Sequence, residues 1–336
     1  MTIKDIAKLA DVSVSTVSRV LNDRPDVSED SRRRVRAVIE AHRYVPNNSA
    51  RDLVRTKSES IGLVVRGVSN PFYTDIIQAI EKTVTDAGFS LVMQQIPSCG
   101  DEVQRAAIME REKRLQGIIF LGGRLDYSPE DLAMLNVPYV CCSYSNQYGT
   151  LRIGEYSAVS IADEEAAQQA VDHLYGHGHR RIAALICRPD DQSISQLRYQ
   201  GYCKALSSHG IPLDPELVMC AGSFDIRDAY DAVCEKLRQG AEFTALFAIA
   251  DSMAIGAMRA LRDEGRAVPQ DCSVIAIDGL ELSAYIEPPL TTLCQPMEEM
   301  GQRSAQILLG LIHGHGAHCC EVLPTQLRQG GSVQDI

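Results

Sequence analysis

The 336-residue chain contains no tryptophan, and aromatic residues make up only 5% of it. It also lacks any apolar run close to the roughly 20 residues that a membrane-spanning helix needs. The first residues form an amphipathic helical pattern rather than a basic and apolar export signal. We therefore expect a cytoplasmic protein with no membrane partner, in which only Phe or Tyr can stack on the ring of a ligand.

Motifs of catalysis are missing as well. The sequence contains no GxSxG, P-loop, HExxH or CxxC motif, and no acid–base pair stands out. Its 11 cysteines are an odd number, and several occur in strand-like apolar runs, namely Cys141, Cys142, Cys187 and Cys294. Reduced, buried thiols are the simplest explanation of this pattern in a cytoplasmic protein. We expect a chain that is not an enzyme and that needs no cofactor.

Charge is distributed unevenly, although the formal net charge of −11 by itself argues against a polyanionic partner. Residues 1–58 hold 12 Lys and Arg against 8 Asp and Glu, a net charge of +4. The remaining residues hold 21 against 36, a net charge of −15. A basic head on an acidic body is expected when only the head touches nucleic acid. The length suggests two or three domains.

Residues 2–22 form the pattern of two short helices joined by a tight polar turn. Thr2 and Asp5 have the capping-box form before an apolar run, and Ser13 is placed to cap the second helix. The second helix is expected to expose a small, polar and cationic face, made of Val14, Ser15, Ser18, Arg19 and Asn22. Such a face suits the floor of the DNA major groove. The alternative is an ordinary helical hairpin whose polar face meets water.

A third helical pattern follows Ser28, which is placed as its N-cap ahead of an acidic first turn. It carries a run of arginines, of which at least some are expected to face outward: Arg32, Arg33, Arg34 and Arg36. Pro46 ends this unit. Residues 46–58 contain no segment long enough for a stable isolated helix, so we expect a linker that becomes helical only when something supports it.

From residue 60 onward, apolar strand-like runs alternate with amphipathic helical patterns. The strand-like runs occupy residues 60–65, 90–95, 117–122, 138–143, 158–163, 180–187, 245–250 and 273–278. The later runs are separated by helical patterns near residues 195–209, 226–239 and 251–264. This alternation indicates parallel sheets covered on both faces. The expected fold class is α/β, with an all-α N-terminal domain and two doubly wound parallel-sheet halves that enclose a cleft.

Several segments carry a family resemblance. They are VSVSTVSRVLN, YVPNNSAR, IGLVV with SNPFY, GHRRIA, RYQGY, DSMAIGAMRAL and EPPLTT. Together, in this order and over essentially the whole chain, they resemble the LacI/GalR family of bacterial transcriptional regulators. The resemblance implies a helix-turn-helix DNA-binding domain, a hinge helix and an effector-binding core like that of periplasmic sugar-binding proteins, at residues 1–45, 46–58 and 59–336. Within the core it implies an N-subdomain and a C-subdomain, at about 59–162 plus 292–322 and about 163–291 plus 323–336.

The resemblance also implies partners. A homodimer binds double-stranded, pseudo-palindromic operator DNA, most often as a repressor. A small-molecule effector, a sugar or sugar derivative, binds in the cleft and controls the affinity for the operator. The alternative is a solute-binding component of a transport system, against which the basic head and the missing export signal count.

Residue by residue, the resemblance assigns DNA contacts to the head and linker. Val14 and Ser15 match the pair that reads base edges, and Arg19 matches an arginine that contacts a base or a phosphate. Leu53 matches the hinge leucine that wedges into the minor groove, although packing within the linker would also explain a leucine there. The expected DNA-binding residues are Val14, Ser15, Thr16, Arg19, Asn22, Tyr44, Asn47, Ala50 and Leu53.

For the effector, the resemblance assigns residues at strand ends and helix starts. Carboxylates and a guanidinium there can bind hydroxyl groups in pairs, as a polyol requires. Taken alone, each charged residue would more often be a cap or a surface ion pair, and Phe72 and Tyr73 would more often be core residues. The expected effector-binding residues are Arg66, Phe72, Tyr73, Asp163, Arg198, Phe224, Asp251, Asp278 and Gln295.

The expected pocket departs from the family pattern at several positions. Ala250 replaces an Asn, Gly279 occupies a position often held by Asp, and Ile194 lies where relatives often place a hydroxyl. Arg66 and Gly67 replace the usual Pro-Asp. Because polar groups are lost and a cation is gained, we expect an altered ligand, anionic or less hydroxylated.

The segment HGHGAHCC, at residues 313–320, could supply zinc ligands on spacing alone. Its glycines and the lack of a paired second cluster favour a variable loop between the last helix and the last strand, so no metal site is expected. The following residues show no leucine heptads of a tetramerising coiled coil, which leaves a dimer as the expected assembly.

Overall fold

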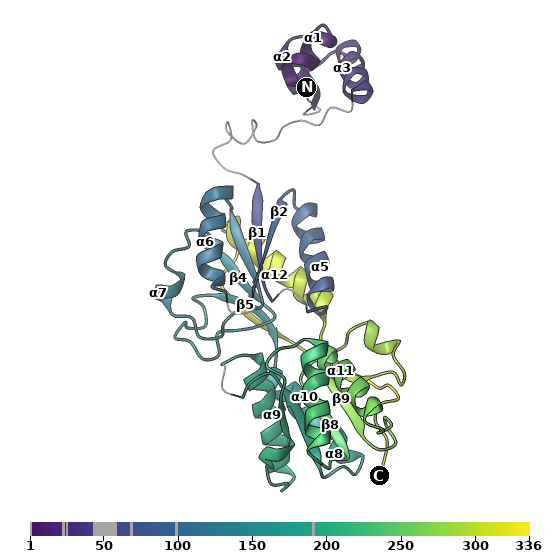
Figure 1. Cartoon of the computed structure of the whole chain (residues 1–336). Coiled ribbons are helices and arrows are strands. Elements are labelled where there is room, and N and C mark those ends of the chain that lie inside the picture. Colours follow the sequence, from purple (N-terminus) through teal and green to yellow (C-terminus); the bar gives the residue numbers. More distant parts are fainter. Residues whose placement is uncertain are drawn as a thin grey trace. The chain divides into compact units, whose positions relative to one another are not determined.

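The computed structural model divides into two compact units, residues 1–58 (the head) and residues 59–336 (the body), each described by itself. The structure describes residues 2–21, 24, 26–42, 59–67, 70–97, 100–189 and 192–336 (Figure 1). None of the helices in these ranges has the length and apolar character needed to cross a membrane.

The described part of the head contains α1 (Ile3–Leu9), α2 (Val14–Leu21) and α3 (Glu29–Ala41). The expected capping box is confirmed, because the side chains of Thr2 and Asp5 each accept a hydrogen bond from the other residue's backbone N–H. Ser13 and Ser28 each accept one from a backbone N–H in the first turn of the following helix, as expected. A small apolar core joins the three helices, formed by Ile6, Ala7, Ala10, Val17, Val20 and Val35.

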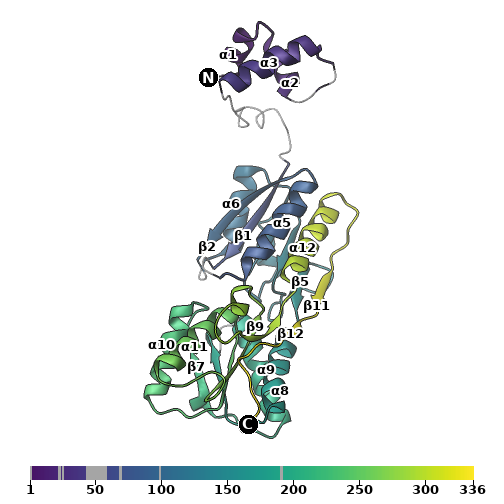
Figure 2. The same cartoon turned by 90° about the vertical axis from the view of Figure 1, so that its right-hand side faces the viewer.

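The body contains two six-stranded sheets. The first has the strand order β11-β5-β4-β3-β1-β2, and all its pairs are parallel. Its strands are β1 (Ser60–Arg66), β2 (Ser90–Ile96), β3 (Gly117–Leu121), β4 (Tyr139–Cys142), β5 (Ser157–Ile161) and β11 (Cys320–Leu323). One face is covered by α5 (Tyr73–Asp86) and α12 (Met297–Ile312), and the other by α6 (Glu102–Lys113) and the short α7 (Pro129–Leu132) (Figure 2). We call this sheet with its helices the first half.

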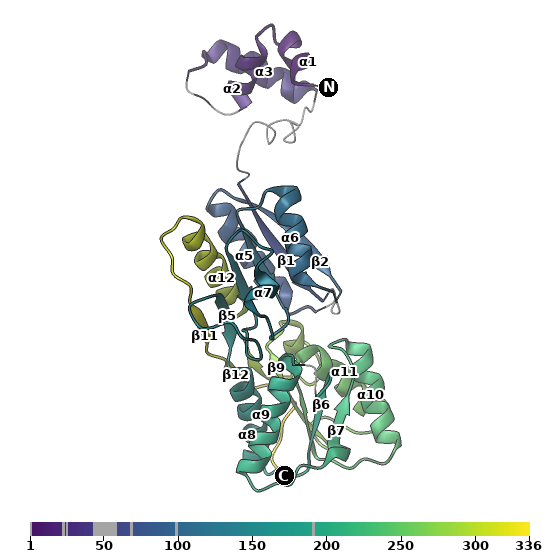
Figure 3. The ribbon, with the colours of Figure 1, turned by 90° about the vertical axis from the view of Figure 1, so that its left-hand side faces the viewer.

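The second sheet has the order β12-β10-β9-β8-β6-β7 and is parallel except for the antiparallel pair of β10 and β12. Its strands are β6 (Ile182–Ile186), β7 (Val218–Cys220), β8 (Ala245–Ala248), β9 (Ser273–Asp278), β10 (Thr291–Cys294) and β12 (Gln326–Arg328). Its two faces are covered by α8 (Asp163–Gly176) with α9 (Ile194–Ser208), and by α10 (Ile226–Arg238) with α11 (Asp251–Asp263) (Figure 3). Short 3-10 turns, η1 (Pro215–Leu217) and η2 (Leu282–Ala284), complete this second half.

Burial on both faces explains why the strands are continuous apolar runs in the sequence. In β1, Ile61, Leu63 and Val65 belong to the apolar cluster that includes α5 and α12, whereas Val64 belongs to the cluster that includes α6. A strand that serves two cores cannot alternate apolar with polar residues. The expected α/β class, with an all-α head and two parallel-dominated sheets, is confirmed.

The chain passes between the two halves three times: after β5 into α8, after β10 into α12, and between β11 and β12. The change of sheet expected near residue 292 falls instead after Cys294, because β10 pairs with β9 along its whole length. The last change falls after Leu323, where β11 ends its pairing with β5.

In the second half, two pairs of neighbouring helices cross at a glycine. A Cβ at Gly256 of α11 would collide with the carbonyl oxygen of Ile226 in α10, and a Cβ at Gly201 of α9 would collide with the carbonyl oxygen of Glu164 in α8. Both neighbours are backbone atoms of a helix, which cannot move aside as a flexible side chain can. The close approach of each helix pair therefore depends on the missing side chain.

Gly256→Ala is expected to destabilise the body by about 1–3 kcal/mol, because an extra methyl group must push α11 away from α10. Urea unfolding of the two proteins measures this difference. The matched control is Gly176→Ala at the end of α8, where a Cβ meets nothing within 4 Å. Alanine is the better helix former, so the control should be unchanged or slightly more stable. Equal midpoints for Gly256→Ala and the parent chain would contradict the close-contact explanation.

Candidate functional site

The outer face of α2 is the polar surface that the sequence predicts. Val14 is 41% exposed, Ser15 is exposed and Thr16 is half-buried, whereas Val17 turns inward to the head core. The side chain of Arg19 remains 57% exposed, with Nη1 3.6 Å from Asp26 Oδ2. Weak pairing at the surface leaves a guanidinium available to another partner.

The arginines of α3 are engaged differently. Arg33 Nη2 lies 2.7 Å from Asp30 Oδ1, and Arg34 Nε lies 3.2 Å from Asp30 Oδ2. Arg34 Nη1 also lies 3.5 Å from the carbonyl oxygen of Asp11, in the turn between α1 and α2. These arginines therefore stabilise the helix and its contact with the turn, and α2 presents the free polar surface.

Five of the expected DNA-binding residues lie outside the described residues: Asn22, Tyr44, Asn47, Ala50 and Leu53.

A buried ion-pair network occupies the carboxyl ends of strands in the second half. Arg198, in the first turns of α9, lies 2.8 Å from Asp163 (Nε to Oδ1) and 3.3 Å from Asp278 (Nη1 to Oδ1). Its Nη1 also donates to the carbonyl oxygen of Ile249. Gln295 Nε2 donates to Asp278 Oδ1 at 2.8 Å. Four of the expected effector residues therefore form one connected group.

The network is shielded from water. Arg198 is only 4% exposed and Asp278 only 2%. Burial raises the pKa of the Asp278 carboxyl to about 7, although the charge of Arg198 acts in the opposite direction. Burial likewise raises the pKa of Asp163, again opposed by Arg198. Burial therefore favours the protonated form of both carboxyls.

Tyr73, a residue of the first half, is affected by the charges of this network. Burial, followed by the charge of Asp278, raises its pKa to about 12. Its hydroxyl lies against Gly122, at the carboxyl end of β3, where a Cβ would collide with it. The neighbouring Phe72 is 3% exposed and belongs to the apolar core, with its ring centroid 5.6 Å from that of Tyr73. Of the two aromatic residues, Tyr73 is the one placed beside the polar network.

Asp251 has a different role from the one expected. Its Oδ2 accepts hydrogen bonds from the backbone N–H groups of Gly279 and Leu280 and from the hydroxyl of Ser283, at 3.1, 2.8 and 2.7 Å. Its Oδ1 accepts one from the hydroxyl of Thr292 at 2.5 Å. Four donors occupy this carboxylate, so it holds the loop after β9 against β10 and leaves a ligand little to bind.

Phe224 is half-buried against the apolar core of the body, and its carbonyl oxygen accepts the Ser252 hydroxyl at 2.8 Å. Ile194 and Leu197 of α9 pack against the apolar cluster of the first half. The first turns of α9 therefore contact both halves at once, with Arg198 in the network and its apolar neighbours across the junction.

A second polar cluster, of which the sequence singled out only Arg66, lies at the carboxyl end of the first sheet. Glu102, the first residue of α6, is 1% exposed and accepts hydrogen bonds from the N–H of Arg124 at 2.8 Å and from the hydroxyl of Tyr127. Arg66, the last residue of β1, has its Nε 3.6 Å from Glu102 Oε2. Tyr144 lies beside Tyr127, with 3.5 Å between the two hydroxyl oxygens. The signal for Glu102 was its place at the start of the helix that follows β2, as Asp163 starts the helix that follows β5.

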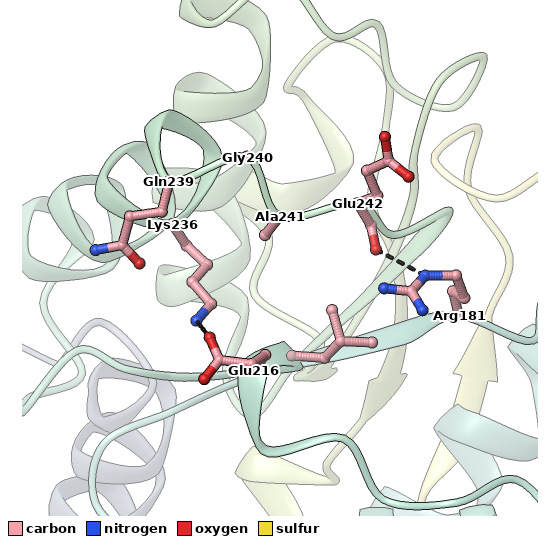
Figure 4. Close-up of a pocket in the computed structure, with 8 residues that line it drawn as sticks. Arg181, Glu216, Lys236, Gln239, Gly240, Ala241 and Glu242 are labelled. Atoms are coloured by element: carbon pink, nitrogen blue, oxygen red, sulfur yellow. Dashed lines mark hydrogen bonds and ion pairs between the residues drawn. The ribbon is translucent and has the colours of Figure 1, made fainter.

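The surface hollow shown in Figure 4 lies elsewhere. It has a volume of about 320 Å³ and is lined in part by Arg181 and Leu217, which directly precede β6 and β7. Its charges are already paired: Lys236 Nζ lies 2.8 Å from Glu216 Oε2, and Arg181 Nε donates to the carbonyl oxygen of Glu242 at 3.0 Å. This hollow is at the amino ends of the strands and contains none of the expected effector residues.

Residues 313–319 join α12 to β11. His318 Nδ1 lies 3.1 Å from the Ser157 hydroxyl oxygen, and the ring of His313 packs edge-on against Phe89. Within the described ranges, no three His, Cys, Asp or Glu side chains are grouped to hold a metal ion.

Comparisons with known proteins match both units. Residues 2–47 match the family of bacterial regulatory proteins of the lacI type, and residues 171–333 match a periplasmic binding protein-like domain. The transcriptional regulator MalR of Clostridium butyricum is 36% identical, with 100% of each chain covered. A regulator CelR–cellobiose complex aligns with a TM-score of 0.72 at 31% identity, over 99% of each chain. The lac repressor dimer bound to operator and the anti-inducer ONPF aligns with a TM-score of 0.80 at 29% identity, over 99% of each chain.

Asp278→Asn is expected to flatten the dependence of the free energy of unfolding on pH. The native carboxyl, with a pKa of about 7, keeps a proton that the unfolded chain loses near pH 4. The stability from this group is therefore fully present below about pH 4 and is lost as the pH rises to about 7. Urea unfolding at several values between about pH 5 and pH 8 measures the slope.

Exposed Asp86, at the end of α5, provides the matched control as Asp86→Asn. It should leave the pH slope of the parent chain unchanged. A slope for Asp278→Asn that equals that of the parent chain would show that Asp278 titrates at an ordinary value, which would contradict the effect of its burial.

Proposed function

Since this chain belongs to the LacI family of bacterial regulatory proteins, we propose that it binds a pseudo-palindromic operator as a homodimer and releases or holds that operator according to a neutral carbohydrate bound between its halves. The chain is a DNA-binding transcriptional regulator, as its relatives are, and not an enzyme. Because operator DNA is its partner, we place its action in the bacterial cytoplasm.

The exposed residues of α2 support a role for this helix in contacting DNA bases. Val14 offers methyl groups to a thymine methyl, Ser15 and Thr16 offer hydroxyls to base edges, and Arg19 can bind guanine O6 and N7 in bidentate fashion. The resemblance assigns Asn22, Tyr44 and Asn47 to phosphate contacts, and Ala50 is a further expected DNA-binding residue. We assign Leu53 to the minor groove, where insertion of an apolar side chain kinks the duplex and widens the groove.

The observation that supports a neutral ligand is the pairing of Arg198 and Arg66 with carboxylates at the junction of the halves. Arg198 has Asp163 and Asp278 as partners, and Arg66 faces the carboxylate of Glu102. Each of these two guanidinium groups has a negative neighbour, which counts against an anionic ligand. Carboxylate and amide groups can form hydrogen bonds with the hydroxyl groups of a carbohydrate. The aromatic ring of Tyr73 can pack against the face of its sugar ring. The relative solved with cellobiose supports this class.

Three connecting segments join the two halves, so a change in their relative position can link ligand binding to DNA binding. A ligand that contacts both halves favours the closed arrangement by its differential affinity for the two arrangements, and by no more than that. The first half carries β1, which directly follows the linker, so a change in its position changes the spacing of the two heads in a dimer. We propose repression as the outcome of operator binding, as in most of the family.

A solute-binding transport component is the competing function. The basic head counts against it, because a transport receptor has no need of a helix-turn-helix unit, and residues 2–47 match a family of regulators. The operator experiment below separates the two functions.

Arg19→Ala is expected to weaken binding to the preferred operator by about 1–3 kcal/mol, because a bidentate contact to guanine is lost. Binding to random duplex DNA should change far less, and fluorescence anisotropy on both duplexes measures the difference. Arg33→Ala is the matched control, since Arg33 pairs with Asp30 within α3. An equal loss on operator and random DNA would assign Arg19 to a phosphate instead.

The full-length chain is expected to select a palindromic site from a pool of random duplexes, and a neutral sugar is expected to change its affinity for that site. Cellobiose, maltose and ribose, added singly to the anisotropy assay, test the response; a shift of fivefold or more corresponds to about 1 kcal/mol of coupling. Selection of no site above bulk DNA, with or without these sugars, would contradict the regulator and favour the transport component.

A further inference from the structure

The cluster formed by Arg66, Glu102, Tyr127 and Tyr144 has no role in the function described so far, although it lies at the edge of the sheet where ligands bind in this type of fold. Arg66 ends β1, and Glu102 begins the helix that follows β2, the strand paired with β1. Both therefore lie at the carboxyl edge of the first sheet. Glu102 is 1% exposed, which is unusual for a carboxylate without a full set of partners.

The two oxygens of Glu102 differ. Oε1 accepts the N–H of Arg124 at 2.8 Å and the hydroxyl of Tyr127. Oε2 has no hydrogen-bond partner among the described residues, and neither has the Nε of Arg66 that faces it at 3.6 Å. That separation is too long for a direct hydrogen bond. A buried acceptor and a buried donor thus face each other without a hydrogen bond, which costs free energy. A group that forms a hydrogen bond with each of them would remove that cost.

The chemistry of the gap selects the bridging group. An anion can accept from Arg66 but is repelled by the carboxylate, and an ammonium group can donate to Glu102 but is repelled by the guanidinium. A hydroxyl group does both, because it donates its proton to Oε2 and accepts the N–H of Arg66. A water molecule can fill the same position until the hydroxyl of a ligand displaces it.

Tyr73 lies close to the end of β1 that carries Arg66. The carbonyl oxygen of Arg66 lies beside Gly122, 3.2 Å from where a Cβ would be, and the Tyr73 hydroxyl lies at the same glycine. The charges of Arg66, Arg198 and Asp278 all act on Tyr73. The next residue, Gly123, leaves room for the hydroxyl of Tyr144. The Tyr73 hydroxyl is therefore a group of the first half that lies near the end of β1 and is affected by the charges of the second-half network.

We propose that Arg66 and Glu102 form a hydroxyl-binding subsite of the first half, which takes one hydroxyl of a neutral carbohydrate while Asp163, Arg198 and Asp278 bind others. This inference rests on the proposed function and adds the residue pair that makes the first half a participant in ligand recognition. Glu102 contacts the ligand directly, and Tyr127 and the backbone of Arg124 act as positioning groups, because they fix its other oxygen.

Glu102→Gln is the discriminating variant. The N–H of Arg124 requires an oxygen at the Oε1 position, so the amide nitrogen must take the place of Oε2. A nitrogen there cannot accept the proton of the hydroxyl, and the charge is lost as well. Affinity for the sugar should fall about tenfold or more, the usual effect of losing a hydrogen bond to a charged group. Arg66→Met removes the hydrogen-bond donor and should also lower the affinity for the same sugar.

The experiment measures sugar binding by the full-length chain without DNA, by titration calorimetry with cellobiose, maltose and ribose, and with glucose 6-phosphate as the anionic probe. Exposed Glu112, on the same helix, gives the matched control Glu112→Gln, which should bind as the parent chain does. Circular dichroism and the melting temperature without sugar confirm that each variant is folded.

Unchanged dissociation constants in both folded variants would overturn the subsite while leaving the operator function in place. Binding of glucose 6-phosphate in preference to the neutral sugars, or binding of no neutral sugar by the parent chain, would overturn it as well. Because DNA is absent from this experiment, its outcome is independent of whether the head selects an operator.

Discussion

A buried guanidinium requires a negative partner, and Arg198 obtains two from separate parts of the chain. Asp163 begins α8 directly after the first passage between the halves, and Asp278 ends β9, more than a hundred residues later. Removing either partner would leave a charge uncompensated in a medium that solvates it poorly. The start of α8, the start of α9 and the edge of the second sheet are therefore fixed relative to one another at the proposed effector site.

The two walls of the junction differ in how completely their polar groups are partnered. In the second half, Asp251 is occupied by four donors, and Arg198 connects two carboxylates, so this wall keeps its shape before a ligand arrives. In the first half, Arg66 and Glu102 face each other across an unfilled donor–acceptor gap. Because the polar groups of the second half are already held in place, less free energy is lost in ordering them when a ligand binds. In the first half, a ligand hydroxyl that satisfies Arg66 and Glu102 would add favourable free energy of binding. That contribution requires both halves to contact the same ligand.

The sequence predicted those features that depend on neighbouring residues. The strand pattern at 273–278 and the helical pattern at 251–264 agree with β9 (Ser273–Asp278) and α11 (Asp251–Asp263) within one residue, because continuous apolar runs and helical spacing are local signals. The short β7 and β12 were not predicted, since three residues carry no periodicity. The hydrogen-bond partners of Asp251 and Glu102 could not be predicted, because each is a carboxylate at a helix start whose donors come from distant parts of the chain. Only the structure shows that Asp251 accepts four hydrogen bonds, whereas Glu102 Oε2 has no hydrogen-bond partner among the described residues.

The order in which the strands occur has a consequence for synthesis of the protein. The described helices of the head lie within residues 1–42, and their core needs nothing further along the chain. Each sheet of the body, however, receives its last strand from the final residues, as β11 (Cys320–Leu323) and β12 (Gln326–Arg328). While the chain is still on the ribosome, the DNA-reading unit can fold early, whereas neither half of the sensor can complete its sheet until translation is nearly finished. A truncated product would therefore carry a finished reading head on an unfinished sensor.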